Sequence, residues 1–323
     1  MKVIHHIFVL LVCFTALPAG AATLPGIPEF IDEMVVRHKF KRAELEGVFE
    51  RAQHLPSVIE TISRPATSKP WLEYRAAFVN PERVRFGLKF WKNNQEALQR
   101  AEREFGVPQE IIVALIGVET VYGQDVGTFR TLDALTTLAF DYPRRVDFFR
   151  SELENFLLLA RDQDFDLLAI RGSYAGALGI PQFMPSSYRN YAVDFNGNHK
   201  ADLLHEPVDA IGSVANYLKS FGWTNSAPVV VRAQISETAC AGDIATPRSL
   251  AAWSSIGVLP REKISPDQPA RLVDFTVAEG KELWLVFKDF EVILRYNNSD
   301  FYAMTVFQLA EELKAANKTS AAR

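Results

Sequence analysis

The chain has 323 residues, of which 48% are hydrophobic and 23% are charged, and its formal net charge is -4. This composition is ordinary for a globular protein with a hydrophobic core, and the negative charge argues against a nucleic-acid partner held by bulk electrostatics. The length allows one large domain or two to three smaller lobes.

The first 21 residues have the features of a cleaved signal peptide. Lys2 gives a positive start, residues 7–17 are apolar, and residues 19–21 are small, as signal peptidase requires. The apolar run is short for a membrane span. Cys13 is not preceded by the small residue that a lipid-anchor signal needs. We therefore expect a soluble exported protein rather than a lipoprotein.

Residues 25–106 carry apolar side chains at helical spacing, so we expect a helical lobe. Asn80, Pro81 and Glu82 combine an N-cap, a first-turn proline and an acidic first turn. They predict the start of a helix that continues to Phe105. Tyr74 lies just before this helix and could face a cleft, although a place in the core is the usual default for such a ring.

The next segment, 107–123, is predicted to be a helix with a proline in its first turn and a glycine at its end. At roughly 100° per residue, Glu119 lies in line with Ile112 and Leu115, on a face that should be buried. Burial should raise the pKa of Glu119. A carboxyl that is still protonated near neutral pH can act as a general acid; the alternative is a structural ion pair with an arginine.

Two arginines begin a later helix. Arg144 and Arg145 stand where the helix dipole disfavours cations, so we expect them to serve something other than helix stability. Glu119, a substrate carboxylate or a phosphate could be their partner. Neutralisation by Asp141 and Asp147 at the surface is the alternative.

The stretch 172–187 is rich in glycine, small residues and proline, which is typical of a loop. Small residues at this density allow a ligand to approach the backbone closely. Ser173 and Gln182 are the polar side chains that such a loop could direct at a sugar.

The segment Asp194–Asp209 has oxygen-bearing side chains at positions 1, 3, 5 and 9, which is the spacing of a calcium loop. His199 takes the sixth position, where glycine is expected, and His205 takes the twelfth, where glutamate is expected. Asp209 could close a longer loop. A metal site in this loop could hold calcium or sodium, or could be empty. The alternative to a metal site is an Asx-rich turn.

The remaining chain mixes helices and strands. Helices are expected at 131–140, 207–221 and 301–315, and strands at 229–231, 271–277, 283–287 and 292–296. Tyr296, Asn297 and Tyr302, near the end of the chain, could return to the cleft.

These motifs together resemble the lytic murein transglycosylases of the B type, which are bacterial envelope enzymes with a lysozyme-like catalytic core. The resemblance rests on G-V-E-T-V-Y-G, D-Y-P-R-R, the glycine-rich loop, the Asp/Asn loop and D-A-I-G-S-V-A-N-Y, and it covers about residues 28–302. It implies an α+β, mainly helical fold. The expected units are a helical lobe (25–106), a lysozyme-like core with an EF-hand-like loop (107–223), a small β lobe (224–300), and a closing helix and tail (301–323).

The resemblance also implies roles for individual residues. Glu119 matches the catalytic acid. The glycan-binding positions are Tyr74, Arg144, Arg145, Ser173, Gln182, Tyr296, Asn297 and Tyr302. The metal-binding positions are Asp194, Asn196, Asn198, Asp209 and the carbonyl of Lys200.

Further expectations concern cofactors and partners. Catalysis needs no cofactor, while a structural calcium or sodium ion is possible in the Asp194–Asp209 loop. We expect a periplasmic monomer that binds peptidoglycan glycan strands, with cell-wall synthesis or remodelling proteins as possible partners and no nucleic acid.

The implied reaction needs a single carboxylate. The 2-acetamido oxygen of N-acetylmuramic acid attacks its own C1 while Glu119 protonates the leaving oxygen, and Glu119 then takes a proton from the C6 hydroxyl to give a 1,6-anhydro sugar. A hydrolytic muramidase would need a second carboxylate, for which Asp125, Asp133 and Asp141 are near in sequence. A peptidoglycan-binding protein without activity is the further alternative.

Overall fold

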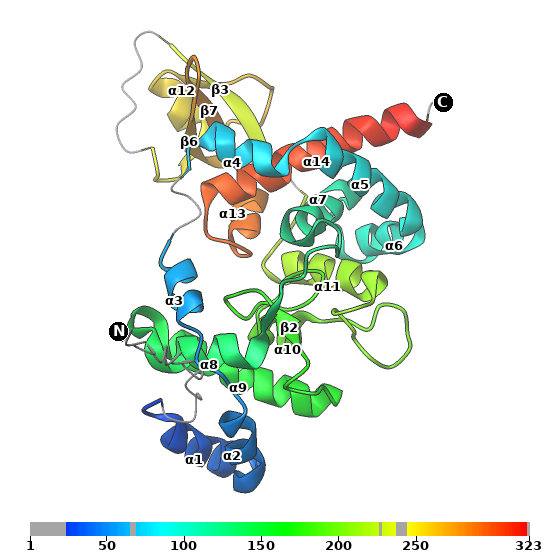
Figure 1. The fold of residues 1–323 in the computed structure, drawn as a ribbon. Coiled ribbons are helices and arrows are strands. Elements are labelled where there is room, and N and C mark those ends of the chain that lie inside the picture. Colours follow the sequence, from blue (N-terminus) through cyan, green and yellow to red (C-terminus); the bar gives the residue numbers. More distant parts are fainter. Residues whose placement is uncertain (1–23, 65–68, 226–227, 237–243, 322–323) are drawn as a thin grey trace, which may run out of the picture.

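The computed structural model describes residues 24–64, 69–225, 228–236 and 244–321 (Figure 1). The helices are α1 (Ile27–His38), α2 (Arg42–Glu50), α3 (Pro56–Ile62), α4 (Trp71–Phe78), α5 (Pro81–Asn93), α6 (Gln95–Phe105), α7 (Gln109–Thr120), α8 (Thr131–Asp141), α9 (Val146–Gln163), α10 (Pro185–Tyr191), α11 (Pro207–Ser220), α12 (Leu250–Ser255), α13 (Lys288–Leu294) and α14 (Asp300–Ala321), with a 3-10 turn η3 (Pro143–Arg145). The strands are β1 (Phe129–Arg130), β2 (Arg171–Gly172), β3 (Val230–Ile235), β4 (Arg248–Ser249), β5 (Val258–Pro260), β6 (Pro269–Val277) and β7 (Gly280–Val286).

Helix α7 lies at the centre of the helical part. Every residue from Ile111 to Val118 is buried, as expected for a helix that is apolar on all sides. Helices α5, α6, α11 and α14 pack around it. The expected helix at 107–123 is therefore present, although it ends three residues before Gly123, at Thr120.

The helices of residues 25–106 pack against three different parts of the molecule. Helix α3 lies on α8, α4 packs on β6 and α14, and α5 and α6 pack on α7 (Figure 1). The N-cap predicted at Asn80 is present, because its side chain accepts a hydrogen bond from the backbone N–H of Arg83 at 2.9 Å.

The predicted single helix from Pro81 to Phe105 is wrong, because the chain breaks at Asn94. There the backbone leaves the helical region (φ -120°, ψ 25°), and the Asn94 side-chain amide donates to the carbonyl of Phe90 at 2.9 Å. Asparagine competes for backbone hydrogen bonds in this way and favours helix ends. The break turns α6 away from α5 and toward α11.

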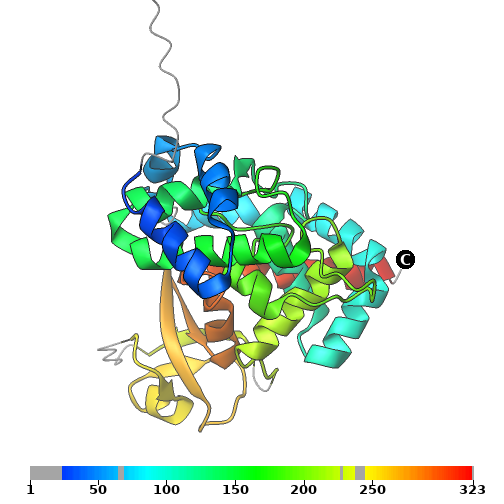
Figure 2. The ribbon, with the colours of Figure 1, turned by 90° about the horizontal axis from the view of Figure 1, so that it is seen from below.

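A five-stranded antiparallel sheet of order β4-β6-β7-β3-β5 follows α11 in the chain. One of its faces has a separate small core that includes Trp253, Leu272 and Phe287. Figure 2 shows the sheet to one side of the helical layer, with α14 running between them. Trp71 of α4 stacks on Phe275 of β6 at 4.5 Å between ring centroids.

The strand predicted at 292–296 is wrong. Residues 292–294 belong to helix α13, in which Phe290, Val292 and Ile293 are buried. A short run of β-branched residues fits either structure, and packing of this face into the main core favours the helix.

No helix of the described residues is long and apolar enough to cross a membrane. The predicted signal peptide, with Cys13, lies outside the described residues.

Candidate active site

Glu119 stands one residue before the end of α7, and three tyrosines from distant parts of the chain surround its carboxyl group. The hydroxyl of Tyr302 on α14, 183 residues away in sequence, donates a hydrogen bond to Glu119 Oε1. Tyr74 on α4 and Tyr296 after α13 are near enough for the charge of Glu119 to raise the pKa of each phenol.

Burial raises the pKa of Glu119 to about 7, and the hydrogen bond from Tyr302 opposes this shift in part. The residue as a whole keeps some exposed surface, so its carboxyl group is largely surrounded by protein but not sealed off. A carboxyl group with such a pKa carries a proton in an appreciable fraction of molecules at neutral pH, as a general acid must. Its partner among the described contacts is a tyrosine, not the arginine that a structural ion pair requires.

The neighbouring tyrosines are themselves fixed by packing. Tyr74 and Tyr302 are 8% and 3% exposed, and burial raises the pKa of Tyr74 to about 12, so the phenol stays protonated. The hydroxyl of Tyr296 donates to the carbonyl of Pro181 at 2.5 Å, which ties the end of α13 to the glycine-rich loop. Tyr217 on α11 stacks against the Tyr296 ring at 4.9 Å.

The backbone just after Glu119 is unusual. Val121, Tyr122 and Gly123 are three consecutive residues with positive φ, of 52°, 63° and 85°. A β-branched residue in this region is an outlier, and each such residue costs on the order of 1–3 kcal/mol. Thr120 helps to hold the turn, because its hydroxyl donates to the carbonyl of Ile180 at 2.8 Å and accepts from the N–H of Gly123 at 2.9 Å.

The glycine-rich loop after β2 is held by its own polar groups. The Ser173 hydroxyl accepts hydrogen bonds from the N–H groups of Ala175 and Ala177, at 3.3 and 3.0 Å. Gln182 has a positive φ of 50°, and its side-chain amide donates to the carbonyls of Val126 and Gly179. Both predicted sugar-binding residues therefore shape the loop, with Gln182 also lining a cavity.

This cavity has a volume of about 540 Å³ and adjoins the Glu119 site through Tyr296, which belongs to both. Of the predicted glycan-binding residues, the cavity wall contains Arg145, Gln182, Tyr296 and Asn297. It also contains polar residues that the sequence analysis missed: Glu152, Ser186, Ser187, Arg295 and Asn298. A signal was available in Ser186 and Ser187, because they are the last two residues of the glycine-rich stretch 172–187.

The two predicted arginines have different surroundings. Arg145 lies over the ring of Phe148 at 3.8 Å and faces the cavity. Arg144 is exposed and is not among the described residues that line the cavity. Asp141, proposed as a surface partner, instead accepts from the His54 ring at 2.8 Å.

Glu152 is a buried carboxylate in the cavity wall. Its oxygens accept from the N–H and the hydroxyl of Ser186 at 2.9 and 2.6 Å, so it caps the start of α10 from α9. Burial raises its pKa, and the hydrogen bonds from Ser186 and the charge of Arg145 oppose this shift.

The three aspartates considered as a second catalytic carboxylate have other partners or positions. Asp133 is buried, pairs with Arg130 at 2.7 Å and accepts from the N–H of Gln53. Asp141 bonds His54. Asp125 is exposed in the turn after α7.

The Asp194–Asp209 loop folds like a cation-binding turn. The Asp194 carboxylate accepts hydrogen bonds from the N–H groups of residues 197–199. The side-chain oxygen of Asn196 accepts from the N–H of Asn198, and that of Asn198 accepts from the N–H of Lys200. His199, at the position where glycine is expected, has the glycine-like φ of 71°. Asp209 is fully buried and closes the loop by accepting from the N–H groups of residues 195, 196 and 202.

The side-chain oxygens of Asp194, Asn196, Asn198 and Asp209 accept backbone N–H bonds within the loop, as in an Asx-rich turn. Carboxylate, amide and carbonyl oxygens are the donors that calcium prefers. The described residues contain no group of three or more His, Cys, Asp or Glu side chains that could hold a metal ion. An ion in this loop would therefore also need the amide oxygens of Asn196 and Asn198 and the carbonyl of Lys200 as ligands.

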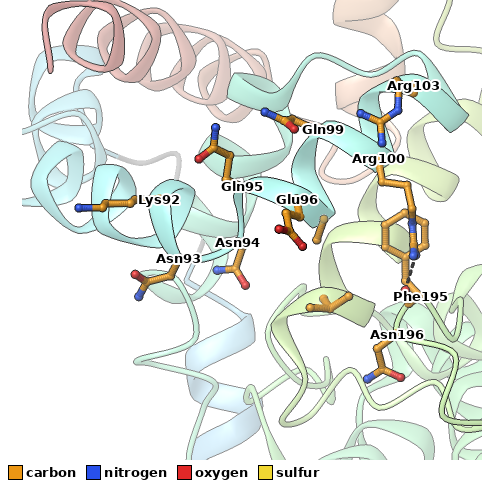
Figure 3. A pocket seen from close by; sticks show the side chains of 12 residues that line it. Lys92, Asn93, Asn94, Gln95, Glu96, Gln99, Arg100, Arg103, Phe195 and Asn196 are labelled. Atoms are coloured by element: carbon orange, nitrogen blue, oxygen red, sulfur yellow. Dashed lines mark hydrogen bonds between the residues drawn. The ribbon is translucent and has the colours of Figure 1, made fainter. Parts of the chain in front are cut away.

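A second hollow, of about 690 Å³, lies at the corner between α5 and α6 (Figure 3). Arg100 stacks on the ring of Phe195 at 3.4 Å there and donates to the carbonyl of the same residue. Of the predicted site residues, the wall contains Asn196 alone. This hollow is therefore separate from the Glu119 site, and Arg100 links α6 to the start of the Asp194–Asp209 loop.

The fold and the site together define an enzyme with a lysozyme-like core and a buried acid carboxyl group beside an open cavity. Residues 24–311 match the family described as "Transglycosylase SLT domain". The chain belongs to this family, and it is a lytic murein transglycosylase. The predicted family, the mainly helical α+β fold and the enzymatic activity are thereby confirmed.

Individual relatives agree with this assignment. The chain is 43% identical to the membrane-bound lytic murein transglycosylase B of Escherichia coli K12 over 305 residues, which is 91% of this chain and 84% of the relative. The E. coli lytic transglycosylase Slt35, solved in complex with calcium, is 42% identical with a TM-score of 0.87, covering 93% of this chain and 96% of that one. SltB3 from Pseudomonas aeruginosa, in complex with NAG-anhNAM-pentapeptide, is 29% identical with a TM-score of 0.78, covering 88% and 78%.

Proposed function

We propose that the enzyme cleaves the β-1,4 bond between N-acetylmuramic acid and N-acetylglucosamine in peptidoglycan without consuming water, and leaves 1,6-anhydro ends. The observation that carries this proposal is the carboxyl group of Glu119, whose pKa of about 7 suits an acid that then becomes a base. The complex of the relative SltB3 with NAG-anhNAM-pentapeptide supports the anhydro product.

In the first step the C1–O4 bond breaks, and Glu119 gives its proton to the leaving O4. The acetamido carbonyl oxygen of the same N-acetylmuramic acid bonds to C1, which forms a cyclic oxazolinium ion. In the second step the Glu119 carboxylate takes the proton of the C6 hydroxyl. O6 then bonds to C1 and releases the acetamido oxygen, so that Glu119 ends protonated, as it began.

The hydrogen bond from Tyr302 stabilises the carboxylate between the two steps, because a donor to the charged form favours that form. The buried phenols of Tyr74 and Tyr302 also keep bulk water from the face of the carboxyl group that they cover. Arg145, Gln182, Tyr296 and Asn297 line the adjoining cavity, and we assign them to glycan binding. Ser173 and Arg144 serve less directly in this proposal, the first through the loop and the second at the rim.

Hydrolysis of the same bond would need a second carboxylate about 5–9.5 Å from the first. Asp133 and Asp141 are held by Arg130 and His54. Glu152 is bound on both oxygens by Ser186. Asp125, the remaining candidate, is exposed in the turn after α7. The engagements of the other three carboxylates favour the mechanism in which the sugar supplies its own nucleophile.

The mass of the products tests the proposal. Purified protein should release muropeptides that end in 1,6-anhydro-N-acetylmuramic acid, each one water lighter than the corresponding product of a lysozyme digest. A digest dominated by reducing ends would refute the mechanism, and no digestion at all would leave a binding protein.

We also propose that the Asp194–Asp209 loop binds calcium for stability. Asp194, Asn196, Asn198, the Lys200 carbonyl and Asp209 would hold the ion, and the left-handed His199 and the E. coli relative's calcium complex support this assignment. The bound ion would neutralise the loop's carboxylates and tie its turns together.

We propose a periplasmic location with peptidoglycan glycan strands as the partner. The signal-peptide pattern of residues 1–21 and the murein substrate in the relative's name support this location. That relative is called membrane-bound; a lipid anchor on the present chain would contradict the expectation of a soluble exported protein, but not the periplasmic location.

A further inference from the structure

Tyr122, which follows the catalytic turn, is seated in a slot made by two glycines on neighbouring helices. A Cβ atom on Gly117 of α7 would lie 2.6 Å from the Tyr122 hydroxyl oxygen and 2.6 Å from Cζ. A Cβ atom on Gly87 of α5 would lie 2.4 Å from the same hydroxyl oxygen. The ring therefore occupies space that any side chain at either position would fill.

Hydrogen bonds close this slot. The Tyr122 hydroxyl donates to the carbonyl of Arg83 at 3.0 Å, and the Arg83 guanidinium donates to the carbonyl of Gly117. The Phe90 ring of α5 packs against the Tyr122 ring, with 5.6 Å between centroids. Tyr122, α5 and the last turn of α7 are thus joined into one rigid unit.

The slot lies on the side of α7 away from the Glu119 carboxyl group. Positions 117 and 119 differ by roughly 200° around a helix, so the ring wedges the helix from behind while the carboxyl group points to Tyr302. Reaching this slot requires the chain to turn back at once, which accounts for the positive φ of Val121 and Tyr122. Tyr122 is not among the described residues that line the cavity.

We propose that Tyr122 is a positioning residue of the reaction, and that its ring in the Gly87–Gly117 slot fixes the last turn of α7 so that Glu119 meets Tyr302. This inference rests on the proposed role of Glu119 as acid and base. A displacement of a reacting group by about 1 Å can cost roughly 10²-fold in rate, so a loosened turn should lower kcat. KM should stay nearly unchanged, because the residues that bind the sugar lie elsewhere.

The test compares Tyr122→Leu with Tyr122→Phe. The leucine variant leaves the slot partly empty and should lower kcat by about 10²-fold, with KM nearly unchanged. It should also move the pH midpoint of kcat, because the groups facing Glu119 (Tyr74, Tyr296 and Tyr302) no longer surround it in the same way. The phenylalanine variant keeps the ring and should retain most of the activity.

Phe30→Leu on α1 provides the matched control, since this buried ring packs on Phe49 and Phe140 at 6.1 and 5.7 Å, and none of the three lines the cavity among the described residues. It should lower the melting temperature without moving the pH midpoint. A Tyr122→Leu enzyme that is folded at the assay temperature and has wild-type kcat and pH midpoint would overturn the proposal.

A second pair of variants covers the case in which Tyr122→Leu does not fold. Gly117→Ala would place its Cβ 2.6 Å from both the hydroxyl oxygen and Cζ of Tyr122 and should lower kcat, because the three nearest atoms all belong to the Tyr122 side chain. Gly47→Ala on α2, whose Cβ would meet nothing within 4 Å, is its control and should leave kcat unchanged. A Gly117→Ala enzyme with wild-type kcat would count against the slot. Failure of the Glu119 assignment is distinguishable, because Glu119→Gln would then remain active.

Discussion

At the scale of single residues, the carboxyl group of Glu119 should lower the stability of the folded protein and raise its activity. Folding raises its pKa from 4.5 to about 7. A carboxyl group whose pKa is raised by folding lowers the free energy of unfolding of the protein as the pH rises from about 4.5 to about 7. The reason is that the folded state keeps the proton to a higher pH than the unfolded state does. Above pH 7 the full destabilisation is present.

Glu119→Gln should therefore be more stable than the wild type at pH 8. At about 1.36 kcal/mol per pKa unit, the difference in the free energy of unfolding should approach about 3 kcal/mol, and it should vanish near pH 4. Cleavage of murein should fall by at least about 10²–10⁴-fold, because the amide cannot donate the proton. Thermal melting at both pH values and a murein digest measure the two effects.

Glu33→Gln, an exposed change on α1, is the control and should alter neither property. A Glu119→Gln protein that cleaves murein at nearly the wild-type rate would show that the acid is elsewhere.

Tyr302→Phe should move the pH dependence of kcat. The hydroxyl donates to the carboxylate and so lowers the pKa of Glu119 against the effect of burial. Without it the pKa rises, and the loss of activity on the alkaline side should begin at a higher pH. The pH profile of kcat, compared with that of Tyr191→Phe, measures the shift, and a shift to lower pH would contradict the assigned role of the hydrogen bond.

At the scale of elements, the metal site proposed in the Asp194–Asp209 loop allows a test of stability that is independent of catalysis. A ligand that binds only the folded state adds about 2.7 kcal/mol at a concentration 100 times its Kd. Millimolar calcium should raise the melting temperature, chelator should reverse the rise, and Asp194→Ala should remove it.

Asp166→Ala is the matched control for this loop, because Asp166 makes a similar turn by accepting from the N–H of Leu168 at 2.9 Å. This variant should lose some stability and keep its response to calcium. A wild-type melting curve that ignores both calcium and chelator would leave the loop as an Asx-rich turn.

The elements also show which parts of the fold the sequence could predict. Helix starts with a clear cap, such as the one capped by Asn80, lie where they were predicted. The break at Asn94 was missed because the apolar period continues across it, while the asparagine side chain decides the backbone. The helix at 292–294 was missed because burial, not intrinsic preference, selects it.

The site likewise has features that the sequence could predict and features that it could not. The burial of Glu119 follows from the spacing within one helix, so the sequence predicts it. Its hydrogen bond to Tyr302 joins residues 183 positions apart, and no local pattern contains that distance. Glu152 was missed because a glutamate on an amphipathic helix is usually solvated, and only the packing of α10 on α9 buries it.

At the scale of the whole molecule, Arg271 connects the sheet to the helix that carries Tyr302. From β6 it donates to both oxygens of Asp300, at 3.0 and 2.6 Å, and to Glu291 at 2.9 Å. These bonds raise the pKa of Arg271 further above its ordinary value. The sheet thereby fixes the start of α14, two residues before Tyr302.

Arg271→Met should therefore lower both stability and activity. Loss of these charged hydrogen bonds at a partly exposed site should cost about 1–2 kcal/mol, measured by denaturant unfolding, and kcat should fall as α14 loosens. Arg232→Met on β3 is the control, because its pair with Glu282 is more exposed and should contribute about 0–1 kcal/mol. Equal effects of the two variants would show that the sheet does not support the site.

The pairing of Glu119 with Tyr302 also orders events in time. Synthesis delivers a polypeptide from its N-terminus, so Glu119 is made long before the tyrosine that completes its surroundings. A nascent chain that ends before residue 302 cannot form this pair, even though α7 is already present. The surroundings of the Glu119 carboxyl group are therefore complete only after the final helix has formed and docked.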